Sequence, residues 1–486
     1  MLLGINALNH DASVCLVNGS EIRFAAHSER YSRRKNDKEL HHRLLADCYN
    51  YGTPTEIVWF EKPFSKAMRR WYSGETPIFQ KVKKHINEHG LGNLPITYVP
   101  HHAAHAAMGF YTSKFEDATV IVVDAIGEWD TTSIWQADHK GLKCVFRNTY
   151  PNSMGLFYSA ATQAIGLKPN EEEYILMGMA AFGKPLYTQL LKDTFFKTWD
   201  GPRSKLKHNL HHGMKQWVNV DGVNHTDFAA SVQTIFEQYM FSLCAYAQVR
   251  LPSKNLIIAG GGALNCAANG KIDDLPNKSF DRIWVPPNPG DAGLSLGAIA
   301  YHTKQPINFE HAYLGHEIKK HVDIRSITDY IGNDQVIAVA NGRAEFGPRA
   351  LGNRSILADP RGPDVKDRVN AVKKREQFRP FAPVILAEHA DEYFELNHND
   401  YGYMQFAVKC RQPELFPAIV HVDGTSRVQT VNKNSPSIIR PILEAWYAKT
   451  GCPMLLNTSM NIKGEPLVNS IWDARIFSNL NKIATF

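Results

Sequence analysis

The sequence predicts an α/β fold that is organised around two copies of a three-stranded β-meander. The first copy has the hairpin signal Asn18-Gly19 and consists of three apolar runs, at 2–7, 12–17 and 21–26. The second copy has the same outline without the same residues, with runs at 120–124, 131–135 and 142–146. The first turn of each copy is polar. We therefore expect strands that deliver functional side chains at tight turns.

This repetition suggests a duplicated ribonuclease-H-like core, the architecture of actin, Hsp70 and the sugar kinases. In that architecture a nucleotide or phosphate lies against tight strand turns whose backbone N–H groups face it. The alternative is two unrelated hairpins. Periodicity fades between Thr303 and Ile318, around Pro306 and Gly315, which predicts two domains, at 1–318 and 319–486.

Composition and charge limit the class of protein. Hydrophobic residues make up 44% and charged residues 21% of the 486, as in soluble globular proteins. The sequence has no apolar run of membrane-spanning length and no basic leader, so we expect a cytoplasmic protein without a membrane partner. Its seven cysteines are scattered without a CxxC pair, which fits reduced thiols. The net charge of +6 suits anionic ligands but is too weak to prove nucleic-acid binding.

A partial metal site is indicated by two histidines and two aspartates. His101 and His105 are four residues apart, so on a helix their imidazoles share one face. Asp124 ends the apolar run 118–123, and Asp291 follows a strand and a Pro/Gly-rich turn. Imidazole and carboxylate ligands suit a borderline transition metal. The alternatives are ordinary core histidines, and for Asp291 a helix N-cap.

A glycine turn follows the predicted strand 255–259. Gly260, Gly261 and Gly262 would let backbone N–H groups approach a phosphate or sugar, and Asn265 opens the next helix. Three glycines in a row are a weak signal by themselves.

The C-terminal part is rich in arginine-bearing turns. They lie at 342–355, 373–376 and 378–383, where arginine alternates with Gly, Pro and aromatic residues. Such turns suit bidentate binding of phosphate or carboxylate. The strand end at 457–461 adds hydroxyl and amide groups that can hold an oxyanion.

Basic residues alternate with aromatic ones in two further segments, 60–90 and 192–217. This pattern is what a polynucleotide groove needs, but solvated surface insertions look the same. The basic run 29–35 is open to the same two interpretations, an anion site or a solvated face.

Motifs along the whole chain resemble the O-carbamoyltransferase family, which includes nodulation-factor and antibiotic-tailoring enzymes. They include NHDAS, SERYSRRK, HHAAHAAMGFYTS, GGGALNCAANG, PNPGDAGLSLGA, EFGPRALGNRSILADPR, FRPFAP and NTSMNIKGEPLV. The resemblance implies a TsaD/Kae-like N-terminal domain and a YrdC-like α/β C-terminal domain. It also implies that carbamoyl phosphate and ATP are condensed to carbamoyl adenylate with release of pyrophosphate. The carbamoyl group would then pass to a hydroxyl, leaving AMP.

The resemblance also implies roles for residues. Iron(II), or another divalent metal, would be held by His101, His105, Asp124 and Asp291, and Mg²⁺ would accompany ATP. His10 is the implied base for the acceptor hydroxyl, and Lys35 lies where the family has a basic residue near the adenylate or acceptor. Nucleotide contacts are implied for Gly260, Gly261, Gly262 and Asn265. Carbamoyl phosphate contacts are implied for Arg349, Lys373, Arg379, Thr458 and Ser459, with Arg354 and Asn461 as further candidates.

Two departures from the family pattern affect the finer details. Ile175 stands where the family commonly has a lysine, and Asn9-His10 keeps only one imidazole of the usual pair.

We therefore expect an ATP-dependent O-carbamoyltransferase. Its acceptor would be a sugar or natural-product hydroxyl, or a hydroxymethylated nucleobase such as 5-hydroxymethylcytosine in a nucleotide or in DNA. The alternatives are a tRNA threonylcarbamoyl-adenosine type of enzyme and a non-catalytic nucleotide sensor of the actin-like superfamily. The oligomeric state stays open, with a homodimer as one option.

Overall fold

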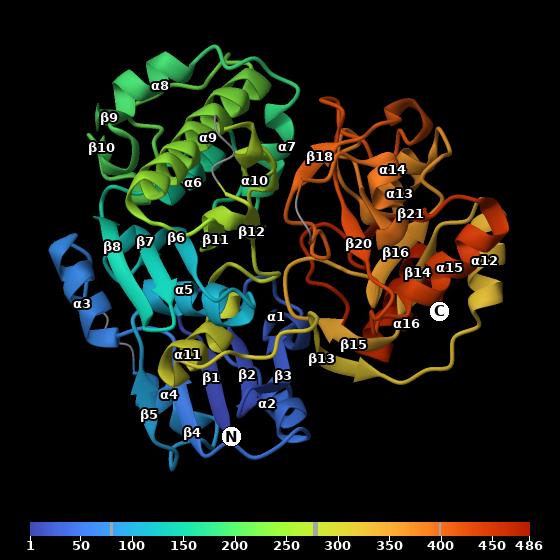
Figure 1. The fold of residues 1–486 in the computed structure, drawn as a ribbon, viewed down its shortest axis with the longest axis horizontal. Helices are drawn as coiled ribbons and strands as arrows, with labels where there is room; N and C mark the ends of the chain where they lie inside the picture. Colours follow the sequence, from blue (N-terminus) through green and yellow to red (C-terminus); the bar gives the residue numbers. More distant parts are fainter. Residues whose placement is uncertain (78–80, 276–279, 398–399) are drawn as a thin grey trace. The chain divides into compact units, whose positions relative to one another are not determined.

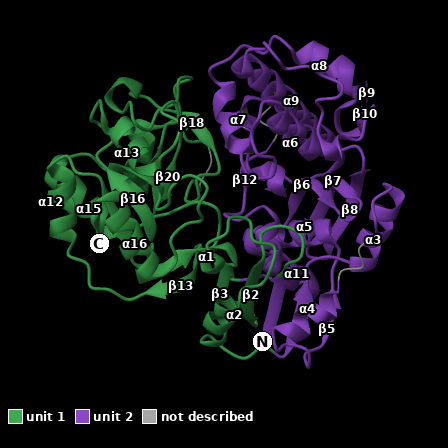
Figure 2. Cartoon of the chain, turned by 180° about the vertical axis from the view of Figure 1, so that it is seen from behind, with its two compact units in different colours: residues 1, 6–54, 308–486 green, residues 2–5, 55–307 purple. Residues whose placement is uncertain are grey.

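The computed structural model describes residues 1–77, 81–275, 280–397 and 400–486 (Figure 1). The chain divides into two compact units (Figure 2). Unit 1 comprises residue 1 with 6–54 and 308–486, and unit 2 comprises 2–5 with 55–307. Helices and strands alternate in both, so the predicted α/β class is confirmed. The units group the chain differently from the predicted domains 1–318 and 319–486, and a domain boundary at 318 stays a prediction.

The first meander forms as predicted. Strands β2 (Ser13–Asn18) and β3 (Glu21–His27) pair in antiparallel fashion across Gly19, whose φ of 61° is the left-handed conformation that favours glycine. Their sheet has the order β3-β2-β1-β4-β5, in which β1 (Leu2–Asn6), β4 (Glu56–Trp59) and β5 (Ile96–Tyr98) run parallel to one another.

The second meander also forms, and its sheet repeats this order. Strands β6 (Ala118–Gly127), β7 (Asp130–Asp138) and β8 (Gly141–Thr149) are antiparallel neighbours. Strands β11 (Asn255–Ala259) and β12 (Arg282–Trp284) extend the sheet in parallel from β6, which gives the order β12-β11-β6-β7-β8. Each sheet is thus a meander followed by two parallel strands.

The buried centre of unit 2 is helix α5 (His101–Thr112), in which every residue is buried. It packs closely on α11 (Leu294–Thr303), because a Cβ added to Gly297 would lie 2.4 Å from the carbonyl oxygen of Ala104. The remaining helices and strands of the unit are α3 (Pro63–Tyr72), α4 (Val82–Glu88), α6 (Met154–Ala164), α7 (Glu173–Ala180), α8 (Thr188–Phe195), β9 (Phe196–Thr198), β10 (Lys205–Leu206), α9 (His225–Arg250) and α10 (Cys266–Gly270).

The C-terminal part of unit 1 is built on a six-stranded mixed sheet of order β20-β17-β21-β16-β14-β22. Its strands are β14 (Ile337–Ala340), β16 (Arg354–Ala358), β17 (Ala382–Leu386), β20 (Gln429–Val431), β21 (Met454–Ser459) and β22 (Ala484–Thr485). The core includes Leu357, Val384 and Leu455 from the sheet with Ile327 of α12 (Ile324–Gly332) and Trp446 of α15 (Ile439–Thr450).

The other elements of unit 1 are α1 (Glu29–Ser32), α2 (His42–Tyr49), β13 (Tyr313–Ile318), β15 (Gly342–Glu345), α13 (Val365–Lys373), α14 (Ala390–Tyr393), β18 (Ala407–Lys409), β19 (Thr425–Arg427) and α16 (Ile471–Asn481). Strand β13 pairs with β15 in antiparallel fashion. Within the described part of the chain, no helix has both the length and the apolar character to span a bilayer.

Candidate metal centre and phosphate-binding cluster

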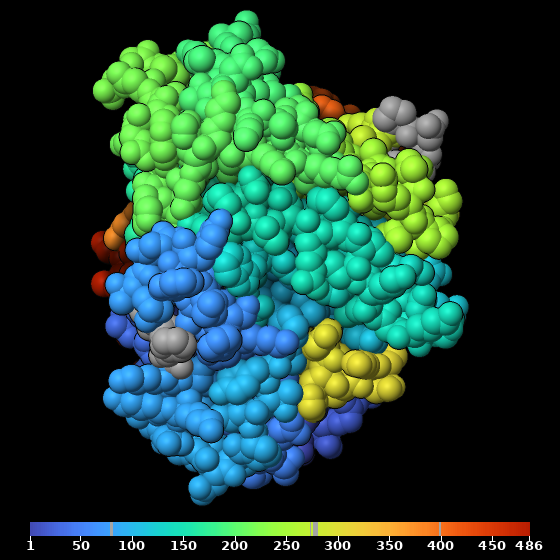
Figure 3. Space-filling view, turned by 90° about the vertical axis from the view of Figure 1, so that its left-hand side faces the viewer, coloured from blue at the N-terminus to red at the C-terminus, as the bar shows by residue number. Residues whose placement is uncertain are grey.

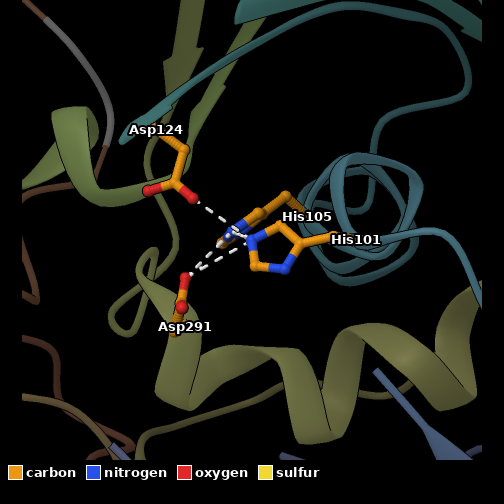
Figure 4. A group of neighbouring side chains, drawn as sticks. All are labelled: His101, His105, Asp124 and Asp291. Carbon is orange, nitrogen blue, oxygen red and sulfur yellow. Dashed lines mark hydrogen bonds and ion pairs between the residues drawn. The ribbon is translucent and has the colours of Figure 1, made fainter. Parts of the chain in front are cut away.

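Four side chains from three parts of unit 2 converge on one point (Figure 4). His101 and His105 lie one turn apart at the start of α5, as their spacing predicts. Asp124 lies in β6, and Asp291 begins the short 3₁₀ helix Asp291–Gly293 that precedes α11. One potential ligand atom from each residue lies within 4.8 Å of the others. The four predicted ligands are therefore brought together.

The distances fit a single coordinated ion. The Nε2 atoms of His101 and His105 are 3.2 Å apart, and Nε2 of His101 lies 3.2 Å from Oδ2 of Asp124. Oδ1 of Asp291 is 3.5 Å from each Nε2. Ligand atoms about 2.1 Å from one metal are roughly 3.0–3.4 Å apart at bond angles of roughly 90–110°. Two imidazoles and two carboxylates suit Fe²⁺, Mn²⁺ or Zn²⁺.

Burial and charge at this centre favour a cation. The side chains of His101 and His105 are 1% and 0% exposed, and those of the two aspartates are 10% and 14% exposed. Burial by itself would raise the pKa of Asp291, but the imidazoles of His101 and His105 bring it well below its usual value. The pKa of Asp124 is lowered despite its burial and despite Asp291, because His101 and His105 face it. Both carboxyl groups are therefore anionic at neutral pH and present negative charge to the centre.

The glycine turn contacts the same centre. The N–H of Gly261 donates to Oδ1 of Asp124 at 3.3 Å. Gly260 has φ 86°, and a Cβ there would lie 2.3 Å from the carbonyl oxygen of Val123. Only glycine can let this turn approach β6 so closely. The turn orients a predicted metal ligand, whereas the nucleotide contacts of Gly260, Gly261 and Gly262 stay a prediction.

Asn265 belongs to a neighbouring polar network. Its Oδ1 caps α10 by accepting from the N–H of Ala268 at 3.0 Å, and its amide exchanges hydrogen bonds of 2.9 and 3.0 Å with Gln233. Gln233 also donates to Glu237, which pairs with Lys271 at 2.8 Å. The predicted nucleotide contact of Asn265 stays untested.

In unit 1, a buried lysine is surrounded by oxygen atoms. Lys373, which ends α13 and is 4% exposed, donates to Oγ of Ser459 and to the carbonyl and side-chain oxygens of Asn461, each at 3.0 Å, and to the carbonyl of Ser459. Burial lowers the pKa of Lys373 well below its usual value, and Arg375 and Arg379 lower it further. Three predicted site residues, Lys373, Ser459 and Asn461, thus form one cluster.

Around this cluster, cations outnumber carboxylates. Arg379 lies 3.3 Å from Glu376, which also pairs with Lys463. Burial would raise the pKa of Glu376, but Lys463 and Arg379 bring it to about 2, so the carboxylate persists in acid. Thr458 pairs with Ile356 in the strand ladder, and its side chain lies on the sheet face opposite to that of Ser459. The side chain of Thr458 therefore points away from the cluster that contains Ser459, and its predicted contact with carbamoyl phosphate stays a prediction.

The loop that carries Arg349 is folded around a buried carboxylate. Oε1 of Glu345 accepts the N–H groups of Leu351, Asn353 and Arg354 at 2.8, 2.9 and 3.2 Å. Arg349 lies within this loop and is half-buried. Glu345 lies within the EFGPRALGNRS motif but was not among the predicted site residues.

Arg354 is fully buried. Its guanidinium donates to the carbonyl oxygens of His316, Asn341, Gly342, Asn353 and Asn469. In this conformation Arg354 holds the backbone of unit 1 together, and its predicted contact with carbamoyl phosphate stays a prediction.

Two arginines of the basic run 29–35 donate to backbone carbonyl oxygens of unit 1, and an anion site in this run stays a prediction. Arg30 is 2% exposed and donates to the carbonyl oxygens of Glu345, at 2.9 Å, and of Gly347. Arg33 donates to the carbonyl oxygens of Pro466, at 2.9 Å, and Leu467. These two arginines connect the N-terminal segment with the loop that carries Arg349 and with residues 466–467, which the charge pattern did not reveal.

His10 has a carboxylate partner. Its Nδ1 lies 2.9 Å from Oδ2 of Asp11, and its side chain is 34% exposed. The turn is unusual, because Asp11 has φ 50° and the amide of Asn6 donates to the carbonyl oxygens of both residues. Burial raises the pKa of Glu29 above its usual value, and the positive charge of Lys35 partly offsets this rise. An imidazole held through Nδ1 leaves Nε2 as the atom that accepts a proton.

Many cations of the two basic-aromatic segments are already paired within the protein. Lys66 contacts Glu61 at 3.0 Å, and Arg69 and Arg70 share Glu75 at 2.9 and 3.1 Å. Lys192 donates to Gln238 and lies 4.3 Å from the ring centroid of Trp199. These contacts reduce the charge that a polynucleotide would meet.

Models of two protein families match the chain. Residues 61–300 match the model described as carbamoyltransferase N-terminus, and residues 328–484 match the one described as carbamoyltransferase C-terminus. An uncharacterized protein of Synechocystis is 32% identical over 97% of this chain and 93% of its own length.

Two nodulation proteins are also similar. NolNO of Sinorhizobium fredii is 32% identical over 96% of this chain and 76% of its own length. Nodulation protein U of Rhizobium fredii is 26% identical over 94% of this chain and 89% of its own. Among solved structures, full-length HypF in its phosphate- and nucleotide-bound form has a TM-score of 0.40 at 14% identity, over 62% of this chain and 46% of that one. That TM-score is too low to assign the fold.

Proposed function

The chain belongs to the carbamoyltransferase family and is an enzyme of that family, and from this premise we propose that it uses ATP to activate carbamoyl phosphate before transfer. The observation that carries the proposal is the buried Lys373 with Ser459, Asn461 and the nearby Arg379. A desolvated cluster of cations and hydroxyl and amide groups binds a phosphate strongly and holds a labile acyl phosphate in a fixed orientation.

The first step balances with one water molecule. Water replaces phosphate on the carbonyl carbon of carbamoyl phosphate, which gives carbamate and inorganic phosphate. An oxygen of carbamate then attacks the α-phosphorus of ATP, pyrophosphate leaves, and carbamoyl adenylate forms. In this scheme Lys373 and Arg379 neutralise the phosphate, and Arg349 assists from the loop held by Glu345. Mg²⁺ accompanies ATP.

In the second step the oxygen of the acceptor hydroxyl attacks the carbonyl carbon of carbamoyl adenylate. The bond to AMP breaks, AMP leaves with the electron pair, and an O-carbamate forms. His10 takes the hydroxyl proton on Nε2, since Asp11 holds Nδ1 and stabilises the imidazolium that results. Asp11 and Lys35 are both close enough to Glu29 to shift its pKa, and Lys35 adds positive charge for an anionic leaving group.

A divalent metal, Fe²⁺ by resemblance, would be held by His101, His105, Asp124 and Asp291. When bound there it supplies Lewis-acid polarisation of an acyl or phosphoryl oxygen. Gly261 keeps Asp124 oriented through its N–H.

The proposed fold assignments follow the same reasoning. The repeated strand order, a meander followed by two parallel strands, supports the duplicated ribonuclease-H-like core. We assign the mixed six-stranded sheet of unit 1 as the YrdC-like part. We assign the glycine turn Gly260, Gly261 and Gly262, together with Asn265, as the nucleotide contact. The acceptor is a hydroxyl-bearing molecule, either a sugar or natural product or a hydroxymethylated nucleobase in a nucleotide or in DNA.

The test is to incubate the protein with ATP and carbamoyl phosphate and to measure pyrophosphate and carbamoyl adenylate by mass spectrometry. Acceptors are then screened for a mass gain of one carbamoyl group. We expect pyrophosphate release that depends on carbamoyl phosphate and is lost in Lys373→Met. The matched control is Lys463→Met, which lies outside the cluster of Lys373, Ser459 and Asn461 and should keep this activity.

Two results would overturn the proposal. If adenylate forms from threonine and bicarbonate instead, the protein is a threonylcarbamoyl-adenosine type of enzyme. If ATP binds and no pyrophosphate is released under any condition, the protein is a nucleotide sensor.

A further inference from the structure

A second feature of unit 2 lies at the same sheet end as the metal centre. Strands β4 and β5 are parallel neighbours, with Trp59 opposite Tyr98, so their carboxyl ends lie at one edge. Ligands of α/β sheets bind outside the carboxyl ends of such strands. His101 follows Tyr98 by three residues, and the ring of Phe60, directly after β4, lies 5.7 Å from the ring of His101.

A cavity of about 580 Å³ opens beside these two strand ends. Its lining combines three lysines with apolar and aromatic side chains: Lys62, Lys81, Lys83, Phe64, Val82 and Tyr98. Tyr98 both lines the cavity and precedes His101 by three residues. An extended chain covers at most roughly 3.6 Å per residue, so about 11 Å separates the Cα atoms of these two residues at most.

The three lysines are uncompensated, unlike their neighbours. Lys66, Arg69 and Arg70 are each paired with a carboxylate at 2.9 to 3.1 Å. For the side chains of the three cavity lysines, no ion pair with another described residue is present, and all three lysines are exposed. Uncompensated ammonium groups around a concave surface attract anions.

Two aromatic residues of the cavity can bind the ring of a ligand. Phe64 is 68% exposed, and Tyr98 is half-buried. Ring faces of this kind stack on planar or sugar rings. The surface of this part of unit 2 is shown in blue in Figure 3. A ligand that carries both a ring and an anionic group is complementary to the cavity.

A hydrogen bond connects the cavity wall to the metal centre. The backbone N–H of Lys62 donates to Oε1 of Glu128 at 2.6 Å. Glu128 has φ 57°, a strained conformation for a residue with a side chain. It follows Gly127, where an added Cβ would lie 2.3 Å from the His101 ring. The cavity and the centre are thus parts of one packed region.

We propose that this cavity binds the acceptor through a phosphate group, with the acceptor's ring against Phe64 and Tyr98, and so selects phosphorylated, ring-bearing hydroxyl compounds. The inference rests on the proposed function for its assignment as an acceptor subsite. No bond forms or breaks in the cavity. The shared chemistry is a ring with a phosphate, which both nucleoside monophosphates and sugar phosphates possess.

The experiment measures binding of five probes to the full chain by calorimetry: uridine 5′-monophosphate, glucose 6-phosphate, uridine, glucose and inorganic phosphate. The test variant is Lys81→Gln/Lys83→Gln, and the matched control is Lys205→Gln/Lys215→Gln, which neutralises two exposed lysines elsewhere in unit 2. We expect at least one phosphorylated probe to bind, about tenfold more weakly in the test variant and unchanged in the control. A second variant, Phe64→Ala, should weaken the ring-bearing probes and leave inorganic phosphate unaffected.

The two phosphorylated probes distinguish nucleotide from sugar acceptors. The inference is wrong if neither of them binds, or if the test and control variants bind them equally. Pyrophosphate release from ATP and carbamoyl phosphate is measured on the same preparations and should be unchanged in the control Lys205→Gln/Lys215→Gln. If that release is absent from every preparation, the proposed function fails, whereas the binding comparison still decides whether the cavity is an anion site.

Discussion

At the scale of single residues, the site depends on side chains that are held by more than one neighbour. Asp124 faces His101 and also accepts from Gly261, and Lys373 contacts four oxygen atoms. Groups fixed in this way need little rearrangement when a ligand binds. Two predictions belong to this scale.

Replacing His101 or His105 by alanine should remove the metal. We expect the affinity for Fe²⁺ or Zn²⁺ to fall at least about tenfold, because even the residues that support metal ligands are worth that much. Metal content after dialysis is measured by mass spectrometry. His102→Gln is the control, since His102 is equally buried on α5 but contacts Ser133 at 2.8 Å. Equal metal content in all three variants would contradict the four-residue site.

Binding of carbamoyl phosphate should weaken as pH rises. Burial lowers the pKa of Lys373, so its ammonium loses the proton at a lower pH than an ordinary lysine does. The cationic form, which binds phosphate, is therefore present below that lowered pKa and is lost above it. The KM for carbamoyl phosphate should rise on the alkaline side, and Lys373→Arg should flatten the rise because arginine stays charged. A wild-type KM that is constant from pH 6 to 10 would count against this role.

At the scale of secondary-structure elements, the metal ligands depend on how tightly α5 and α11 pack. Gly297 on α11 leaves space for the backbone of α5 at Ala104, next to His105. Small residues at a helix contact allow this approach, whereas an added methyl group must displace one helix.

Gly297→Ala should therefore destabilise the protein by about 1–3 kcal/mol and weaken metal binding. Urea unfolding with and without metal measures both effects. Gly178→Ala is the matched control, because Gly178 also lies in a helix, α7, and its added Cβ would meet no atom within 4 Å. That change should be neutral or stabilise by up to about 1 kcal/mol. Equal effects of the two substitutions would show that the helix contact tolerates the extra carbon.

At the scale of the whole molecule, unit 1 combines segments that are far apart in sequence. Arg30 contacts the carbonyl oxygens of Glu345 and Gly347, more than three hundred residues away, and so supports the Arg349 loop. Tyr31 donates to Asp47 at 2.6 Å, and His316 lies 2.8 Å from the same carboxylate oxygen. The N-terminal segment is thus part of the framework that holds the loop carrying Arg349.

Arg30→Gln should raise the KM for carbamoyl phosphate by roughly tenfold or more, since small displacements of positioning loops are costly. Limited proteolysis should also cut the 345–354 loop faster. Arg34→Gln, a mostly exposed arginine four residues away, is the control and should leave both measurements unchanged. If Arg30→Gln behaves like this control, the contact does not position the loop.

Much of this arrangement can be predicted from sequence because it depends on local pattern. Alternating apolar runs and Asn18-Gly19 predict the hairpin, and the spacing of His101 and His105 predicts their shared helix face. Asp124 lies in β6 and Asp291 follows β12, and these two strands run in the same direction in one sheet, so both chain segments lead toward the same sheet edge. These features require only secondary structure and its periodicity.

Other features depend on burial and long-range contacts, which local pattern does not encode. Arg354 and Lys373 look alike in sequence, as basic residues in loop-rich motifs, yet the first is surrounded by backbone carbonyls and the second by the oxygens of two predicted site residues. Arg30 and Arg33 read as part of a charged run, and only the fold reveals their distant partners. Glu345 stabilises its loop by accepting hydrogen bonds from three backbone N–H groups, a role that its residue type does not reveal.

The discontinuous make-up of unit 1 has a consequence for the order of folding during synthesis. Residues 6–54 leave the ribosome before the rest of unit 1, which begins at residue 308, about 250 residues later. At roughly 5–20 residues per second, this is a delay of about 12–50 seconds. During that time the guanidinium groups of Arg30 and Arg33 lack their carbonyl partners, while residues 55–307 can already assemble the metal ligands. The nascent chain can therefore bring His101, His105, Asp124 and Asp291 together before Lys373 meets Ser459 and Asn461.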